Sequence, residues 1–441
     1  METLTRAQSN LSDVNLENER LTLRILMVSG ALTCLAGLNC GWFGPLVPSI
    51  AVAQKMPLVE AGSIISVYSA GSLLPLAVGR QLVERFGGRK CLLAAALLFG
   101  GGLEILSVGT GGLGLSLGAA ALGVGAGLNS IAGTICILRL ASGSSAAAVG
   151  KLNVFFGIGA LLGPVIAYFG LNSPWSYHAV YFFGALYALA VFLTALAAKN
   201  IDVTVPPADA RSAHFHPMQT PAVLYTLAVF LYVGIEVAVA TWLFTYLSMT
   251  CRLPKELAAL SMTALWGGLT TGRMVAIPLF RHYSSAVIAL SAIGLVFSMI
   301  LSLCLFPTLG SLALAVVFLL GLGLGPIFPT LISSASERYG AHSASITSLV
   351  VTFGAFAGIT FPLLIGQVFS RFGHQQGMLV LALCSLILAA VFYAVQFRLK
   401  RSQPAKHEPA RAQSTTSEAA FSPSVETQTA GQLKAEAESG L

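Results

Sequence analysis

Two acidic side chains, Glu104 and Glu236, lie well inside long apolar stretches of this 441-residue chain. A carboxylate in apolar surroundings is costly unless it is paired, solvated or protonated. Glu236 lies deep within its stretch, where a carboxyl group can take up and release a proton, so we predict that it is an ion-coupling residue. The alternative is a permanently protonated glutamate that bonds to a neighbouring helix. Glu104 stands beside three glycines and is interpreted as a structural acid.

Three carboxamides, those of Asn39, Asn129 and Asn153, also lie in the middle of apolar stretches. Because a carboxamide both donates and accepts hydrogen bonds, it suits a solute rich in hydroxyl or amide groups. The same groups can instead link two helices, at a gain of under about 1 kcal/mol each. We predict that all three residues bind substrate, with the helix cross-link as the alternative.

A further group, Trp242, Thr245 and Tyr246, has the spacing i, i+3 and i+4 and shares one face of a helix. An indole beside hydroxyl groups can stack on a sugar or cap a cavity, so we predict that these residues bind substrate. The alternative is a place in the aromatic belt at the membrane–water interface. Glu236 and Trp242 are six residues apart and lie on different faces of a straight helix.

The segment 79–90 combines one acid, Glu84, with four basic residues and three glycines. We expect a short turn there, in which Glu84, Arg85 and Arg89 pair with helix ends and act as a gate. Membrane topology alone would explain the bases, but it requires neither the acid nor the glycines. Arg273 stands six residues before the end of an apolar stretch. We expect it to reach the same membrane surface and to belong to this gate.

The composition excludes a water-soluble protein, because 56% of the residues are hydrophobic and only 9% are charged. Soluble domains carry about 25% charged residues. The net charge of +7 forms no dense basic patch, so nucleic acid is not an expected partner. The seven cysteines have no close-spaced pair, which argues against a metal site. Without a phosphate-binding loop of the type Gly-x4-Gly-Lys, we predict neither a cofactor nor enzymatic activity.

Apolar stretches long enough to cross a bilayer predict an all-α membrane protein with twelve transmembrane helices in two six-helix pseudo-symmetric halves. The expected spans are 25–50, 61–79, 90–110, 113–138, 145–169, 178–198, 222–249, 256–279, 284–305, 311–335, 343–368 and 376–397. The predicted domains are a cytosolic N-terminal tail (1–20), the halves (21–198 and 221–398), a cytosolic linker (199–220) and a disordered cytosolic tail (399–441). Sixteen basic residues on one set of loops against four on the other place both termini in the cytosol.

The two predicted halves share a repeated pattern of glycines. The Gly-x-Gly-x-Gly pattern of residues 123–127 recurs at 321–325, and Phe156-Gly157 recurs as Phe353-Gly354 at almost the same offset. Two parallel repeats of six helices form one architecture of membrane transporters.

The segment 79–90 resembles the cytoplasmic loop signature of the major facilitator superfamily, with Glu84 where Asp is usual. Four further segments are similar to the fucose–proton symporters and the sodium-dependent glucose transporter-like proteins of that superfamily; they are 152–164, 234–246, 267–273 and 325–329. The segment 37–48 fits the same pattern, but Cys40 stands where relatives often carry an acid beside the asparagine. Asn153 stands where they often carry His.

The resemblance implies a secondary active transporter that moves a small polar, sugar-like solute by alternating access, coupled to a proton. It implies a monomer in the lipid bilayer of the plasma membrane. An efflux transporter is the alternative, because Gly159-x3-Gly163-Pro164 resembles the helix-packing motif of proton-coupled exporters. A non-transporting membrane sensor or scaffold on the same fold is the alternative from another class.

Overall fold

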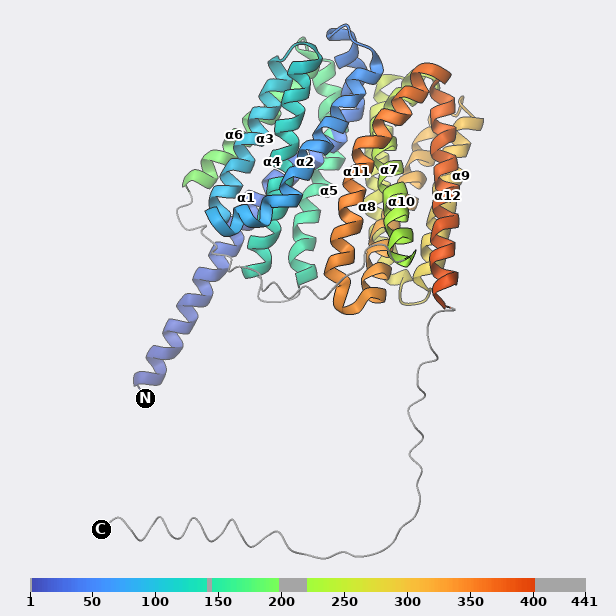
Figure 1. Cartoon of the computed structure of the whole chain (residues 1–441). Coiled ribbons are helices and arrows are strands. Elements are labelled where there is room, and N and C mark those ends of the chain that lie inside the picture. Colours follow the sequence, from blue (N-terminus) through green and yellow to red (C-terminus); the bar gives the residue numbers. More distant parts are fainter. Residues whose placement is uncertain (1, 141–144, 198–219, 401–441) are drawn as a thin grey trace, which may run out of the picture. The chain divides into compact units, whose positions relative to one another are not determined.

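The computed structural model describes residues 2–140, 145–197 and 220–400, which are helical throughout apart from short turns (Figure 1). These residues form twelve α-helices and one 3-10 turn, η1 (Gly340–His342). The helices are α1 Glu2–Ala53, α2 Leu58–Phe86, α3 Gly88–Val108, α4 Gly111–Leu140, α5 Ser145–Leu171, α6 Ser176–Ala197, α7 Thr220–Met249, α8 Lys255–Leu279, α9 Ser285–Leu305, α10 Leu312–Tyr339, α11 Ser343–Phe372 and α12 His374–Lys400. Each predicted span falls on one of these helices, so the expected fold class is confirmed.

Successive helices run in opposite directions along the bundle (Figure 1). We call the end at which α1 begins and α12 ends the terminal end, and the opposite end the far end. Within the described residues, eleven helices are long and apolar enough to cross a membrane. The remaining helix, α8, carries Lys255, Glu256 and Arg273 and is less apolar, yet it packs closely against α10 inside the bundle.

The segment 79–90 is not a turn of several residues, because α2 continues to Phe86 and α3 begins at Gly88. Nothing between Arg80 and Phe86 interrupts a helix, whereas Gly87 has φ = 83°, a left-handed conformation that favours glycine. The predicted linker at 199–220 and tail at 399–441 lie almost entirely outside the described residues.

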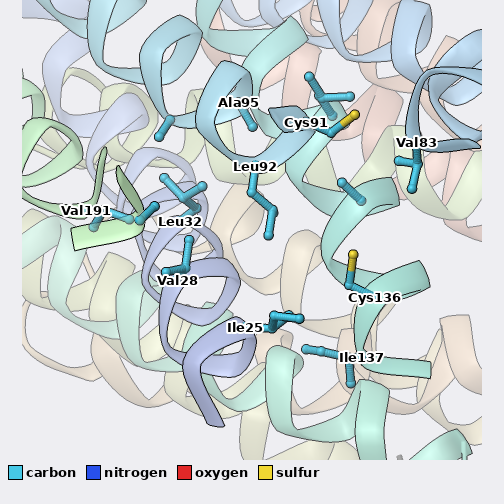
Figure 2. Packing of buried hydrophobic residues seen from close by; sticks show 14 of the residues in the cluster. Ile25, Val28, Leu32, Val83, Cys91, Leu92, Ala95, Cys136, Ile137 and Val191 are labelled. Carbon is cyan, nitrogen blue, oxygen red and sulfur yellow. The ribbon is translucent and has the colours of Figure 1, made fainter. Parts of the chain in front are cut away.

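A cluster of buried apolar side chains holds the first half together near its terminal end (Figure 2). It draws Ile25 and Leu32 from α1, Leu92 from α3 and Ile137 from α4 into one region. Lipid tails are as apolar as these side chains, so the helices are held together here by close van der Waals packing rather than by removal of apolar surface from water. These contacts fix α1, α3 and α4 relative to one another, and therefore fix the polar side chains that the same helices carry.

The repeated glycines occupy equivalent contacts in the two halves. A β-carbon added at Gly125 of α4 would lie 2.8 Å from the Ala95 carbonyl oxygen of α3. One added at Gly323 of α10 would lie 3.0 Å from the Ala292 carbonyl oxygen of α9. The glycines therefore let helix backbones approach closely at the same place in each half, as expected of two pseudo-symmetric repeats.

Candidate functional site

Glu236 lies within α7 as a half-buried side chain in an uninterrupted helix. The Tyr232 hydroxyl and the Arg273 guanidinium of α8 lie close enough to its carboxyl group to interact with it electrostatically. Tyr232 precedes Glu236 by four residues and therefore lies on the same face of α7. Its hydroxyl also donates a hydrogen bond of 3.0 Å to the Leu324 carbonyl oxygen of α10. One acid, one base and one phenol thus meet within the second half.

The first half contributes two further side chains to this region. Cys40 of α1 lies within electrostatic range of Glu236, and Tyr68 of α2 lies within range of Cys40. Cys40, the position at which the sequence resemblance leads us to expect an acid, is therefore close enough to feel the charge of the Glu236 carboxyl group. The site is therefore assembled from α1 and α2 of one half and from α7 and α8 of the other.

One face of α8 carries four side chains with polar atoms. They have the spacing i, i+3, i+7 and i+10 and are Thr263, Trp266, Thr270 and Arg273. The Thr270 hydroxyl donates to the Trp266 carbonyl oxygen over 2.9 Å. Three buried atoms on this face find no hydrogen-bond partner within the described part of the chain; they are Thr263 Oγ1, Trp266 Nε1 and Arg273 Nε. This polar face helps to explain why α8, alone among the described helices, is not apolar enough to count as a candidate membrane span.

The three carboxamides have different surroundings. Asn39 is buried and accepts a hydrogen bond of 3.1 Å from Trp42 Nε1, one turn away on α1. Asn129 is also buried; it accepts from the Ser29 hydroxyl over 3.1 Å and donates to the Thr33 hydroxyl over 3.1 Å, so its amide links α4 to α1. Asn153 is exposed on α5. The amide of Asn129 is therefore engaged between helices, whereas that of Asn153 is accessible.

The predicted aromatic face of α7 is fully buried. Trp242 Nε1 donates to the Pro362 carbonyl oxygen of α11 over 3.0 Å, and its ring centre lies 5.3 Å from that of Phe369. Tyr246 donates to the Leu303 carbonyl oxygen of α9 over 2.9 Å. The Thr245 hydroxyl is buried without a hydrogen-bond partner among the residues that the structure describes. Trp242 and Tyr246 thus contact different helices, although they lie one turn apart.

Of the four predicted gate residues, Glu84, Arg85 and Arg89 lie at the terminal end. Glu84 accepts from Arg80 Nε over 2.8 Å, an ion pair within α2 that is exposed to solvent. Arg85 is exposed, with its guanidinium carbon 5.4 Å from the centre of the Phe86 ring. Arg89 donates to the Leu196 carbonyl oxygen of α6 over 2.8 Å. In this conformation Glu84 and Arg89 are therefore bound to their own half, whereas Arg273 lies beside Glu236.

The two halves contact each other chiefly toward the far end. The main helix pairs packed across the halves are α1–α7, α2–α11 and α5–α8, with smaller contacts of α1 with α8 and of α2 with α7. A β-carbon added at Gly44 of α1 would overlap the Ala240 carbonyl oxygen, and one at Gly62 of α2 would overlap the Trp242 ring. Tyr168 and Glu256 meet across α5 and α8 at 3.5 Å, also near this end. Neither α4 nor α10 packs across the halves in the described residues.

The arrangement of two six-helix repeats around a polar site is matched by similarity to known proteins. A sequence profile described as the Major Facilitator Superfamily matches residues 30–362. The chain belongs to the major facilitator superfamily. Its multiple spanning helices make this member of the superfamily an integral, multi-pass membrane protein.

Two relatives are similar to this chain over most of their own length. The chain is 24% identical over 396 residues to "Bypass of stop codon protein 6" of Saccharomyces cerevisiae, covering 81% of this chain and 78% of the relative. It is 23% identical over 376 residues to the glucose/mannose transporter GlcP of Bacillus subtilis, covering 82% and 90%. A crystal structure of a mutant of the nucleoside transporter NupG matches with a TM-score of 0.71 at 16% identity, covering 85% of this chain and 99% of that chain. The structural likeness shows the fold alone.

Proposed function

We propose that this chain is a secondary transporter that moves a hexose-like sugar by alternating access and couples the movement to a proton at Glu236. The observation that carries the proposal is the electrostatic interaction of Glu236 with Arg273 within the membrane-spanning region, where Cys40 of the other half is also within electrostatic range. The similarity to a glucose/mannose transporter supports the class of solute. The proposal includes a monomeric protein in the plasma membrane.

The chemistry of the pair supports proton coupling. A charged carboxylate in the membrane is costly, and the positive charge of Arg273 lies close enough to offset part of that cost. A proton on Glu236 removes the negative charge that attracts the guanidinium, so the Arg273 donors can turn to the hydroxyl groups of a sugar. Proton and guanidinium thus compete for one carboxyl group. Such competition links the protonation of Glu236 to the occupancy of the site.

The position of the site supports alternating access. Glu236 and Arg273 belong to one half, whereas Cys40 and Tyr68 belong to the other. A solute bound between them contacts both halves and stabilises the conformation in which they are close.

The Gly159-x3-Gly163 motif, which led us to consider efflux, packs α5 against α1, because a β-carbon at Gly163 would lie 2.7 Å from the Leu38 carbonyl oxygen.

Solute exchange in liposomes tests the class of substrate. Liposomes that contain the purified protein and unlabelled D-glucose inside are expected to take up labelled D-glucose from outside by counterflow. Labelled uridine, the control solute, is expected to exchange no faster than in protein-free liposomes. Exchange of uridine without exchange of any hexose would contradict the proposed solute.

Thiol labelling of intact cells tests the orientation, which rests on the excess of basic residues at one set of loops. In a cysteine-free background, an impermeant maleimide is expected to label a cysteine at Asn172, in the far-end turn after α5, but not one at Ser212. Permeabilised cells serve as the control in which both positions react. The reverse pattern in intact cells would place the termini outside.

A further inference from the structure

An apolar groove lies on the outer surface of the second half, between α8, α9 and α10. Its volume is about 310 Å³, at the lower end of the range of about 300–1,000 Å³ typical of ligand sites. It is lined by aliphatic side chains and glycines, with Ser291 and Tyr283 as the side chains that carry a polar atom. Val287, half exposed at 51%, shows that the groove is open to its surroundings.

The mouth of the groove carries positive charge. Two of the lining residues are Leu279, the last residue of α8, and Tyr283, in the turn between α8 and α9. The same turn contains Arg281 and His282. Arg281 is exposed, and within the described residues no carboxylate forms an ion pair with it. The turn lies at the terminal end of the bundle, the side on which the basic residues of this chain are concentrated. The apolar groove thus ends at Tyr283, two residues along the same turn from the unpaired guanidinium of Arg281.

We propose that this groove binds one acyl chain of an anionic phospholipid, whose phosphate group is held at the mouth by Arg281 and the Tyr283 hydroxyl. A phospholipid matches both parts of the site, because its chain is apolar and its phosphate accepts hydrogen bonds from a guanidinium. Basic pockets between membrane helices bind anionic headgroups in this way. Tyrosine suits the boundary, since its ring is apolar and its hydroxyl is polar.

The groove lies directly behind the transport site. Gly272 lines the groove and is adjacent in sequence to Arg273, which lies beside Glu236. A β-carbon at Gly272 would overlap the Leu322 carbonyl oxygen, so α8 and α10 are in close backbone contact there. An acyl chain in the groove packs against both helices and stabilises this contact. The bound lipid therefore supports the helix that positions Arg273, although it does not contact the solute.

Native mass spectrometry of the purified full-length protein tests the site with two lipids that have the same oleoyl chains. Phosphatidylglycerol is expected to bind about fivefold more tightly than phosphatidylcholine, the contribution of one arginine at a membrane surface. Arg281→Gln is expected to remove this preference. Arg24→Gln, the same charge change at an exposed position of α1, is expected to leave it intact.

A second pair of variants tests the groove itself. Ser291→Phe places a ring in the groove and is expected to weaken the binding of both lipids. Ser298→Phe adds the same ring two turns further along α9, at an exposed position outside the groove lining, and is expected to bind lipid like the wild type. Equal binding of the two lipids by the wild type, or equal effects of the two phenylalanine variants, would overturn the proposal.

Discussion

Glu236→Gln is expected to abolish accumulation of solute while leaving exchange intact. The amide keeps the shape of a protonated carboxyl group and can still bond to Tyr232, but it cannot bind or release a proton. Alternating access itself does not require proton release, so labelled solute should still equilibrate across a liposome membrane. When a pH difference is imposed, the wild type should concentrate solute and the variant should only equilibrate it.

Glu104→Gln provides the matched control for this experiment. Glu104 is also a half-buried acid within the membrane-spanning region, but it lies on α3, and the helices that supply the site are α1, α2, α7 and α8. Its replacement is expected to leave accumulation unchanged. Normal accumulation by Glu236→Gln together with a loss in Glu104→Gln would move the coupling role to Glu104.

Gly62→Val is expected to prevent the halves from closing at the far end. In this structure the Trp242 ring occupies the space beside Gly62, and a β-carbon added at Gly366 of α11 would also lie only 2.7 Å from this ring. Overpacking at such a contact costs about 1–3 kcal/mol, and a shift of this size changes the ratio of two conformations about 5–150-fold. Solute flux is therefore expected to fall, because the protein is held in the arrangement that is open at this end.

Spin labels at Asn172 and Gln376, exposed positions near the far end of the two halves, measure this opening. The mean distance between them is expected to increase in Gly62→Val. Gly101→Val, with no atom within 4 Å of its added β-carbon, is expected to change neither the distance nor the flux. Trp242→Ala in the Gly62→Val background removes the overlap and should restore the shorter distance. An unchanged distance in Gly62→Val would show that Trp242 does not control closure.

The helices and their repeat could be predicted from the sequence because both depend on local patterns. An apolar stretch of sufficient length predicts a spanning helix wherever it occurs. The glycines at 123–127 and 321–325 predict close backbone contacts, since any side chain there would separate the helices. Those contacts occur at Gly125 and Gly323.

The directions of side chains within a helix could not be predicted in the same way. The spacing of Trp242 and Tyr246 is compatible with one shared face, yet the first bonds to α11 and the second to α9. Each ring is large enough to reach a different neighbour, and which helices lie on either side of α7 is decided by packing of the whole bundle. The single-residue turn at Gly87 was missed for a related reason. The charged residues before it are compatible with either a loop or a helix end.

Tyr232 and Tyr68 are the site residues that the sequence did not reveal. Tyr232 had a usable signal, because it precedes Glu236 by four residues on the same helix face. Tyr68 had none, since its approach to Cys40 depends on how α1 packs against α2. Cys40 was noted for the acid that relatives carry there, and only the fold shows that this position lies beside Glu236.

The most direct test of coupling at Glu236 is a simultaneous record of proton and sugar movement. Liposomes with a pH-sensitive dye inside and no initial pH difference are given external D-glucose. The wild type is expected to acidify the interior as sugar enters, and Glu236→Gln is expected to exchange sugar without any change of internal pH. Sugar entry by the wild type at constant internal pH would contradict coupling at Glu236 and leave a facilitator in its place.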